Sequence, residues 1–376
     1  MDFASTFRAL PVLATVLAAP IAQADIRSFN AAVQAGDYRG AMVVAGQTWP
    51  TVDLASPSAA LVAREFAWVA MLAGEPASAL MYSRFLVEQG NALPHPDPAP
   101  AVSRVLHDWA TLEAAASPQA RAKLMQSLYT RATAPGRDLI SPRAAHALFA
   151  ESWAAGEWSQ AESAAMYAIR FLDDLEAGSI AARFEARRGA AMARFMRTKS
   201  IEAYNALYDI AGEVHDQIAA TSDGAGRARL ATEYYAAAAW ADAIYGGVGS
   251  RQRELADRRA SISTGRAPMN ELLYPAPGDA SLPRCRIALA RADSPGFPFI
   301  PKFKDLAGSV TYAAEVAQNG VLQNPRLMAW APHPDFVRAT EAVQSSWRWR
   351  IEGTLQPPAC RLPKVHIVTF EYALGR

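Results

Sequence analysis

Three acidic side chains lie close together in the stretch FLDDLEAG, which contains Asp173, Asp174 and Glu176. Two neighbouring carboxylates could act as a general acid and a general base. At the end of a helical pattern, however, such carboxylates usually form a solvated surface. The histidines are scattered without the spacing of a metal site, at positions 95, 107, 146, 215, 333 and 366.

Motifs of nucleotide-binding proteins and hydrolases are absent from the sequence. The stretch GGVGSR, which begins at Gly246, lacks the lysine of a phosphate-binding loop. There is no His-Glu-x-x-His and no Gly-x-Ser-x-Gly. We therefore expect a protein that is not an enzyme, with no catalytic residue, no metal and no cofactor.

The N-terminal stretch MDFASTFRALPVLATVLAAPIAQAD is typical of a secretory signal peptide. Arg8 precedes an apolar segment that ends at Ala22, and the small residues Ala22 and Ala24 fit a cleavage site. Two prolines interrupt this segment, which is shorter than the roughly 20 residues that cross a bilayer. We predict a signal peptide over residues 1–24 and a periplasmic mature protein. The alternative is an uncleaved anchor that holds the protein in the inner membrane, facing the periplasm.

Export changes how the two cysteines, Cys285 and Cys360, are interpreted. An oxidising compartment favours a disulfide between them, and we predict this pairing. Two unrelated buried thiols are the alternative. With no histidine at ligand spacing, the pair does not predict a zinc site.

Length and charge limit the classes of partner. The chain has 376 residues, enough for two or three domains, and 51% of them are hydrophobic. Lys and Arg number 37 against 36 Asp and Glu, so the net charge is close to zero. No overall field attracts nucleic acid, and we expect none as a partner.

An internal repeat runs through the N-terminal two thirds of the chain. The fragments AVQAGDYRGAMVVAG, VAMLAGEPASALMYS and ESWAAGEWSQAESAA each carry an Ala five positions after a Gly. Two degenerate copies continue the spacing of 38 to 42 residues. The five turn positions are Gly36, Gly74, Ala115, Gly156 and Thr198.

Each copy predicts two helices joined at this turn. The pattern resembles tetratricopeptide repeats, in which an aromatic residue follows the glycine, as Tyr38 and Trp158 do here, although the period exceeds the usual 34 residues. The resemblance implies an α-solenoid of TPR-like hairpins over residues 25–264, ending with helices at 227–245 and 250–261. Such an array has a concave surface that binds peptides or proteins; a spacer without a ligand is the alternative.

Composition and period change after residue 264. The segment 265–296, rich in proline, predicts a linker with one strand in RCRIALARA. Two extended runs, 309–317 and 321–330, flank QNG, a hairpin signal. The stretch HPDFVRATEAVQSSW then predicts a helix with Phe336 and Trp347 on one face, and KVHIVTFEYAL alternates as a strand does.

This order of hairpin, helix and strand resembles the C-terminal domain of the TonB family over residues 297–376. The stretches GSV from Gly308, NGV from Asn319 and WRI from Trp349 stand at that family's strand start, hairpin tip and helix exit, although Ile351 replaces the usual aromatic residue. The resemblance implies a small α+β domain. The predicted fold class is thus a multidomain protein, an all-α solenoid followed by a TonB-like α+β domain. We interpret the tryptophans of the basic, aromatic stretch AVQSSWRWRIEG as core residues.

The resemblance also implies how the protein functions. We favour a periplasmic adaptor that binds protein or peptide partners, such as outer-membrane receptor segments or the cell wall. The alternative is an energy transducer that couples an inner-membrane motor to outer-membrane receptors. In this family a partner strand pairs with the final strand, so the matching edge has specificity residues His366, Val368, Phe370 and Tyr372. An internal strand, or a homodimer that pairs through this strand, is the alternative.

Overall fold

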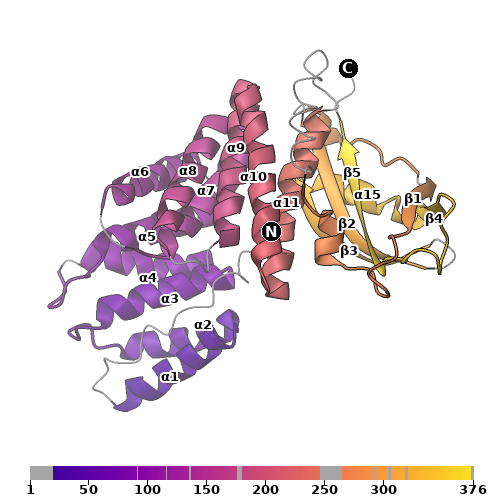
Figure 1. The fold of residues 1–376 in the computed structure, drawn as a ribbon. Coiled ribbons are helices and arrows are strands. Elements are labelled where there is room, and N and C mark those ends of the chain that lie inside the picture. The colour runs from indigo at the N-terminus through magenta and orange to yellow at the C-terminus, as the bar shows by residue number, and fades with distance from the viewer. Residues whose placement is uncertain are drawn as a thin grey trace. The chain divides into compact units, whose positions relative to one another are not determined.

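The structure is a computed structural model in which two compact units, Met1–Ala193 and Arg194–Arg376, can be distinguished. The chain is mostly helical and carries small antiparallel sheets towards its C-terminus, which agrees with the predicted helical region followed by an α+β region (Figure 1). The described residues are 20–90, 92–115, 117–134, 137–175, 180–245, 265–291, 293–303, 306–317 and 321–373.

The first unit is built from helices that pair consecutively along the chain (Figure 1). Four helical hairpins are followed by one further helix, whose last residues belong to the second unit. Their bounds are α1 (Pro20–Gln34), α2 (Tyr38–Thr48), α3 (Ala59–Ala73), α4 (Pro76–Gln89), α5 (Pro100–Ala115), α6 (Pro118–Ala132), α7 (Ile140–Ala155), α8 (Trp158–Asp173) and α9 (Ile180–Thr198).

The predicted repeat turns lie between the paired helices. Gly36, Gly74 and Gly156 have φ angles of 76°, 75° and 77°, a left-handed conformation that glycine adopts without steric cost. In the degenerate copy near Ala115, Ser117 instead caps α6, its side chain accepting a hydrogen bond from the N–H of Ala120 at 3.1 Å. The alanines five positions after each turn are all buried: Ala41, Ala79, Ala120, Ala161 and Ala203.

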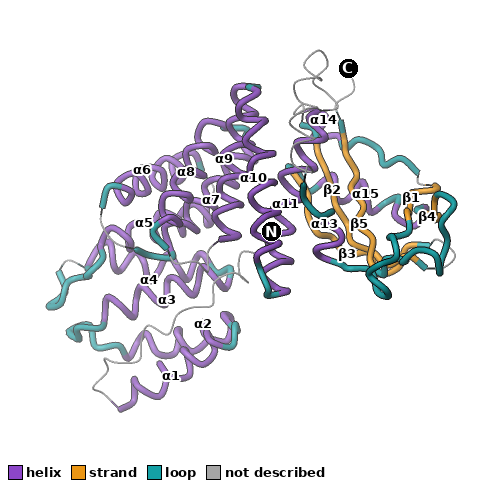
Figure 2. The backbone as a smooth tube through the Cα atoms, viewed as in Figure 1, coloured by secondary structure: helices purple, strands orange, loops and turns teal. Residues whose placement is uncertain are grey.

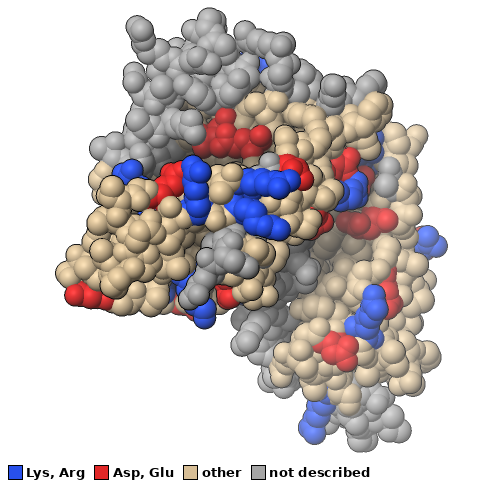
Figure 3. Space-filling view, turned by 90° about the vertical axis from the view of Figure 1, so that its right-hand side faces the viewer, with Lys and Arg blue, Asp and Glu red and all other residues tan. Residues whose placement is uncertain are grey.

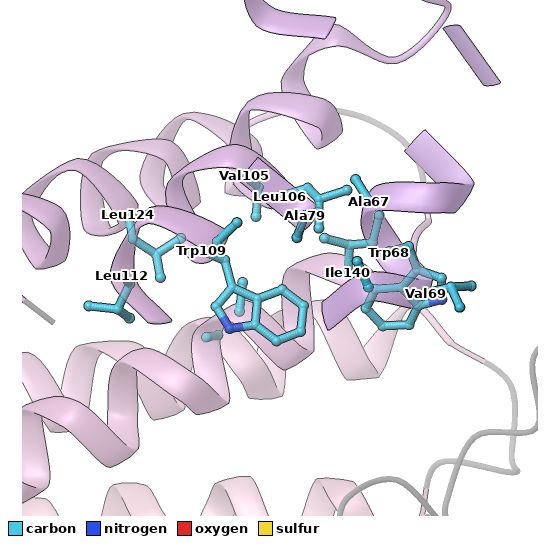
Figure 4. Packing of buried hydrophobic residues seen from close by; sticks show 14 of the residues in the cluster. Ala67, Trp68, Val69, Ala79, Val105, Leu106, Trp109, Leu112, Leu124 and Ile140 are labelled. Carbon is cyan, nitrogen blue, oxygen red and sulfur yellow. The ribbon is translucent and has the colours of Figure 1, made fainter. Parts of the chain in front are cut away.

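The core of the first unit is continuous from one hairpin to the next. Trp68 of α3 and Trp109 of α5 approach with their ring centroids 6.0 Å apart (Figure 4). Ala79 of α4 lies beside them and has no exposed surface, so the helices can approach closely there. Contacts between large side chains, and close approach at small ones, thus join neighbouring hairpins.

The second unit combines helices with two antiparallel sheets (Figure 2). Helices α10 and α11 precede all of its strands in the chain, although the sequence assigned their residues to the repeat array. The elements are α10 (Ile201–Ala220), α11 (Gly224–Tyr245), α13 (Met269–Leu273), β1 (Arg286–Arg291), α14 (Phe299–Phe303), β2 (Gly308–Val316), β3 (Leu322–Ala331), α15 (Asp335–Glu341), β4 (Arg348–Glu352) and β5 (Val365–Tyr372).

The larger sheet has the strand order β3-β2-β5 and is covered on both faces. Val310 and Tyr312 of β2 pack with Phe336 of α15 on one face. The alternate residues Ser309 and Thr311 are equally buried on the other face, where α11 lies against the sheet. The smaller sheet pairs β1 with β4, and β1 lies within the stretch RCRIALARA.

The helix predicted to carry both Phe336 and Trp347 is shorter than the sequence indicated. Helix α15 ends at Glu341, and a 3-10 turn, Gln344–Ser346, follows it. Val343 has left the helical region, with φ at −111°, so Trp347 is extended and not helical. The prediction of one continuous helical face was therefore wrong. Both aromatic residues nevertheless enter the same core.

Of the remaining sequence predictions, the structure confirms the cysteine pairing, and several others concern residues that it does not describe. Cys285 and Cys360 form a disulfide, with their Cα atoms 4.9 Å apart, which confirms the predicted pairing. Residues 1–19 of the predicted signal peptide, the predicted helix at 250–261 and the QNG hairpin tip lie outside the described residues. Among the described helices, none has the length and apolar character that a membrane span requires.

Candidate functional site

Strand β5 forms one edge of the larger sheet and pairs with β2 in an unbroken register. Eight consecutive residues, from Val365 opposite Glu315 to Tyr372 opposite Gly308, pair without irregularity. In an antiparallel edge strand, every second residue directs its N–H and C=O groups away from the sheet. This edge can therefore offer an incoming strand a regular row of donors and acceptors.

The opposite edge, β3, is much less suited to strand addition. Pro325 has no N–H to donate, and Asn324 has a left-handed backbone with φ at 50°. The register between β2 and β3 is irregular at two places. These features are the ones that natural sheets use to prevent an edge from pairing.

The four predicted specificity residues of β5 lie on one face of the strand. Phe370 stacks on Trp347 with ring centroids 4.4 Å apart, and the ring of His366 lies 4.7 Å from that of Trp349. Tyr372 is buried against Phe336, and Val368 packs on the same cluster. Val368, Phe370 and Tyr372 therefore face the core that contains Phe336 of α15, whereas His366 packs on Trp349 of β4.

Hydrogen bonds fix the end of β5 in place. The hydroxyl of Tyr372 lies 2.6 Å from Oγ1 of Thr340 and donates to the carbonyl of Phe336 at 3.2 Å. Burial raises the pKa of Tyr372, so this hydroxyl remains a donor. On the opposite face, the hydroxyl of Thr369 lies 3.0 Å from that of Thr311 on β2.

The start of β5 has an unusual electrostatic environment. Burial, together with the positive charge of Arg284, lowers the pKa of His366 to about 4. His366 is thus a neutral residue at the edge of the sheet, in contact with Trp349 of β4. Arg284 was not identified from the sequence; its one signal there is its position directly before Cys285.

The two acidic candidates that the structure describes, Asp173 and Asp174, lie at the end of α8. Asp173 pairs with Arg183 at 3.3 Å and keeps 59% of its side-chain surface exposed, as expected of a solvated helix end. Asp174 follows directly after α8, and Glu176 lies outside the described residues. Within the described part of the chain, no group of His, Cys, Asp and Glu could hold a metal ion.

One face of the molecule shows how its charged side chains are distributed. On the face drawn in Figure 3, basic and acidic side chains are interspersed among uncharged ones. This agrees with the nearly equal numbers of the two kinds in the sequence.

Comparisons with protein families, with curated proteins and with solved structures find no match for this chain.

Proposed function

We propose that this protein is a periplasmic adaptor that binds an extended segment of a partner protein along the outer edge of β5. The observation that carries the proposal is the contrast between the two sheet edges. The edge at β5 is regular over eight residues, whereas Pro325 and Asn324 interrupt the edge at β3. Backbone pairing at β5 supplies affinity, and neighbouring side chains select the partner.

Several observations support the adaptor. The resemblance of residues 297–376 to TonB-family domains favours strand addition at the last strand. The disulfide between Cys285 and Cys360 is of the kind found in exported proteins. The helical hairpins of the first unit, with glycine turns in register, support a TPR-like solenoid scaffold with a second surface for proteins.

The alternative is an energy transducer, which the same resemblance supports. A transducer needs a retained membrane anchor, whereas an adaptor is released after cleavage near Ala24. N-terminal sequencing of protein isolated from the periplasmic fraction separates the two. We expect a chain that begins near Asp25; an intact Met1 in the membrane fraction would favour the transducer.

Amide hydrogen exchange tests the binding edge directly. Peptides from the periplasm-facing segments of outer-membrane receptors are added to the purified protein, and binding is measured by calorimetry. We expect every second amide between Val365 and Tyr372 to gain protection, because those amides point away from β2. The amides of β3, Leu322–Ala331, are the internal control and should not change. Binding without any change at β5 would place the contact elsewhere, most simply on the helical hairpins.

A further inference from the structure

Arg284 is a partly buried residue whose guanidinium has no hydrogen-bond acceptor for its terminal nitrogens among the described residues. Its two terminal nitrogens, Nη1 and Nη2, are both shielded from solvent, and neither donates a hydrogen bond. Burial lowers the pKa of Arg284, the direction expected of a desolvated guanidinium. A buried charge is normally paired, because removing it from water is costly. An anion bound to this unpaired guanidinium would therefore stabilise it.

The backbone around Arg284 is held rigidly. Arg284 and Arg361 form a parallel bridge, in which the N–H of Cys285 donates to the carbonyl of Arg361 and the N–H of Arg361 donates to the carbonyl of Pro283, each at 2.8 Å. The disulfide to Cys360 closes the same pair of segments. The backbone that carries Arg284 is therefore ordered before binding, so a ligand does not have to order it.

The neighbouring Arg361 differs from Arg284, because its guanidinium has backbone carbonyls as hydrogen-bond acceptors. Its Nε donates to the carbonyl of Leu282 at 2.8 Å, and its Nη1 donates to the carbonyl of Ala276 at 3.2 Å. Arg361 thus has a structural role, and its charge adds to the positive potential at Arg284. Glu271 is near enough to raise the pKa of Arg284, but no ion pair joins the two in the described part of the chain.

The position of Arg284 connects it with β5. Its bridge partner, Arg361, precedes Val365, the first residue of β5, by four positions. Its charge acts on His366 of the same strand. A second buried donor, Nε1 of Trp349, also lacks an acceptor, and the Trp349 ring packs on His366. The start of β5 is therefore rich in donors that the described residues leave unused.

We propose that the guanidinium of Arg284 binds a carboxylate of the partner strand and so places an acidic residue of that strand beside the N-terminal end of β5. This inference rests on the proposed strand addition at β5. A carboxylate fits because its two oxygens can accept from Nη1 and Nη2 together, as a bidentate pair. Selection of an acidic partner then comes from one charge pair, while the backbone of β5 binds without regard to sequence.

The free protein gives the first test, in which no ligand is needed. Replacement of Arg284 by methionine removes an unpaired charge whose terminal nitrogens are shielded from solvent, and it keeps much of the side-chain volume. We expect Tm to rise by about 2–4 °C. The matched control is Arg286→Met, because Arg286 is exposed two residues further on, and its Tm should not change. A fall in the Tm of Arg284→Met would show that Arg284 already has a partner in the free protein and would overturn the proposal.

The second test uses synthetic peptides as probes. Each is an eight-residue strand of alternating valine and threonine, capped at both termini, with aspartate or asparagine at its first or its last position. We expect the wild-type protein to bind one of the aspartate probes about 10-fold or more tightly than its asparagine counterpart. In Arg284→Met this ratio should fall to about 1, while Arg286→Met should keep it. The preferred position of the aspartate reports the direction of the added strand.

The outcomes separate this inference from the proposed function. If the aspartate and the asparagine probes all protect the amides of β5 and bind with equal affinity, strand addition stands and the role of Arg284 is refuted. If probes bind without protecting those amides, the proposed edge itself is wrong, and the inference that rests on it is also wrong. Sodium acetate is compared with sodium chloride at equal ionic strength as a further arm. Stabilisation by acetate without any preference among the peptides would show a site for small anions only, which also overturns a partner carboxylate.

Discussion

Trp347 lies nearly parallel to Phe370 of β5, with the ring centroids 4.4 Å apart and the planes inclined by 24°. Tyr312 of β2 meets the same indole edge-on at 5.8 Å. Trp347 therefore covers two neighbouring strands from the segment between α15 and β4. This contact explains why the basic, aromatic stretch near the C-terminus belongs to the core.

Loss of this contact should destabilise the second unit strongly. Trp347 has no exposed surface, so Trp347→Ala leaves a large cavity and should lower the free energy of unfolding by about 3–5 kcal/mol. Trp347→Phe should cost less, because the indole nitrogen has no acceptor to lose among the described residues. Urea unfolding followed by circular dichroism measures both. The control is Arg350→Ala, an exposed position where we expect a change within about 0.5 kcal/mol. Equal effects of the three substitutions would contradict the core position of Trp347.

The repeat turns make a prediction about the first unit. Gly156 has a φ of 77°, and an alanine there adopts a left-handed conformation at a cost of about 1–2 kcal/mol. Gly46 lies within α2, exposed and with open space around a new Cβ, so Gly46→Ala should stabilise by about 0.5–1 kcal/mol. Thermal unfolding of the two variants should shift in opposite directions. Shifts in the same direction would argue against the turn geometry.

The sequence could predict features that depend on local chemistry. Gly36, Gly74 and Gly156 marked their turns because glycine alone tolerates the left-handed backbone without cost. At the last turn, Thr198 ends α9 as expected, but the left-handed residue is Lys199, with φ at 51°. A lysine side chain does not favour the left-handed conformation, so the sequence could not indicate that Lys199 adopts it.

Features that depend on distant contacts could not be predicted. Apolar periodicity showed that α11 is a helix, but it does not say that the partner of its second face is a sheet. The pairing of β1 with β4 joins residues that lie about 60 positions apart, for example Ile287 with Ile351. The unpaired state of Arg284 is likewise a property of the folded environment. The sequence thus indicated the strand β5, which carries the candidate site, but it did not indicate Arg284.

The disulfide should contribute substantially to the stability of the second unit. Cys285 and Cys360 are 75 residues apart, so their link removes about 4 kcal/mol of conformational entropy from the unfolded chain in the chain-entropy model. The double variant Cys285→Ser/Cys360→Ser should lose a similar free energy of unfolding. The wild-type protein in reductant should match the double variant. Two free thiols in the native protein, detected by mass spectrometry of non-reduced material, would contradict the pairing.

His366 should make stability depend on pH in the acidic range. The folded pKa of about 4 lies below the ordinary value of 6.5, so the unfolded chain binds the proton more readily. Stability contributed by neutral His366 is complete above pH 6.5 and is lost as the pH falls towards 4. We expect a loss of about 2 kcal/mol between pH 7 and pH 4.5, after allowance for the partial exposure of the ring. In His366→Phe this part of the loss should disappear, whereas His95→Phe, at an exposed position, should behave as the wild type does.

The same titration connects His366 with Arg284. Burial is the larger cause of the lowered pKa, and the charge of Arg284 is the second. In Arg284→Met the pKa of His366 should therefore rise towards its ordinary value without reaching it, which NMR titration of the imidazole can measure. Arg286→Met provides the control, because its charge is exposed to solvent and more strongly screened. An unchanged pKa in Arg284→Met would show that the guanidinium does not act on the start of β5, and the partner carboxylate would then have to be sought elsewhere.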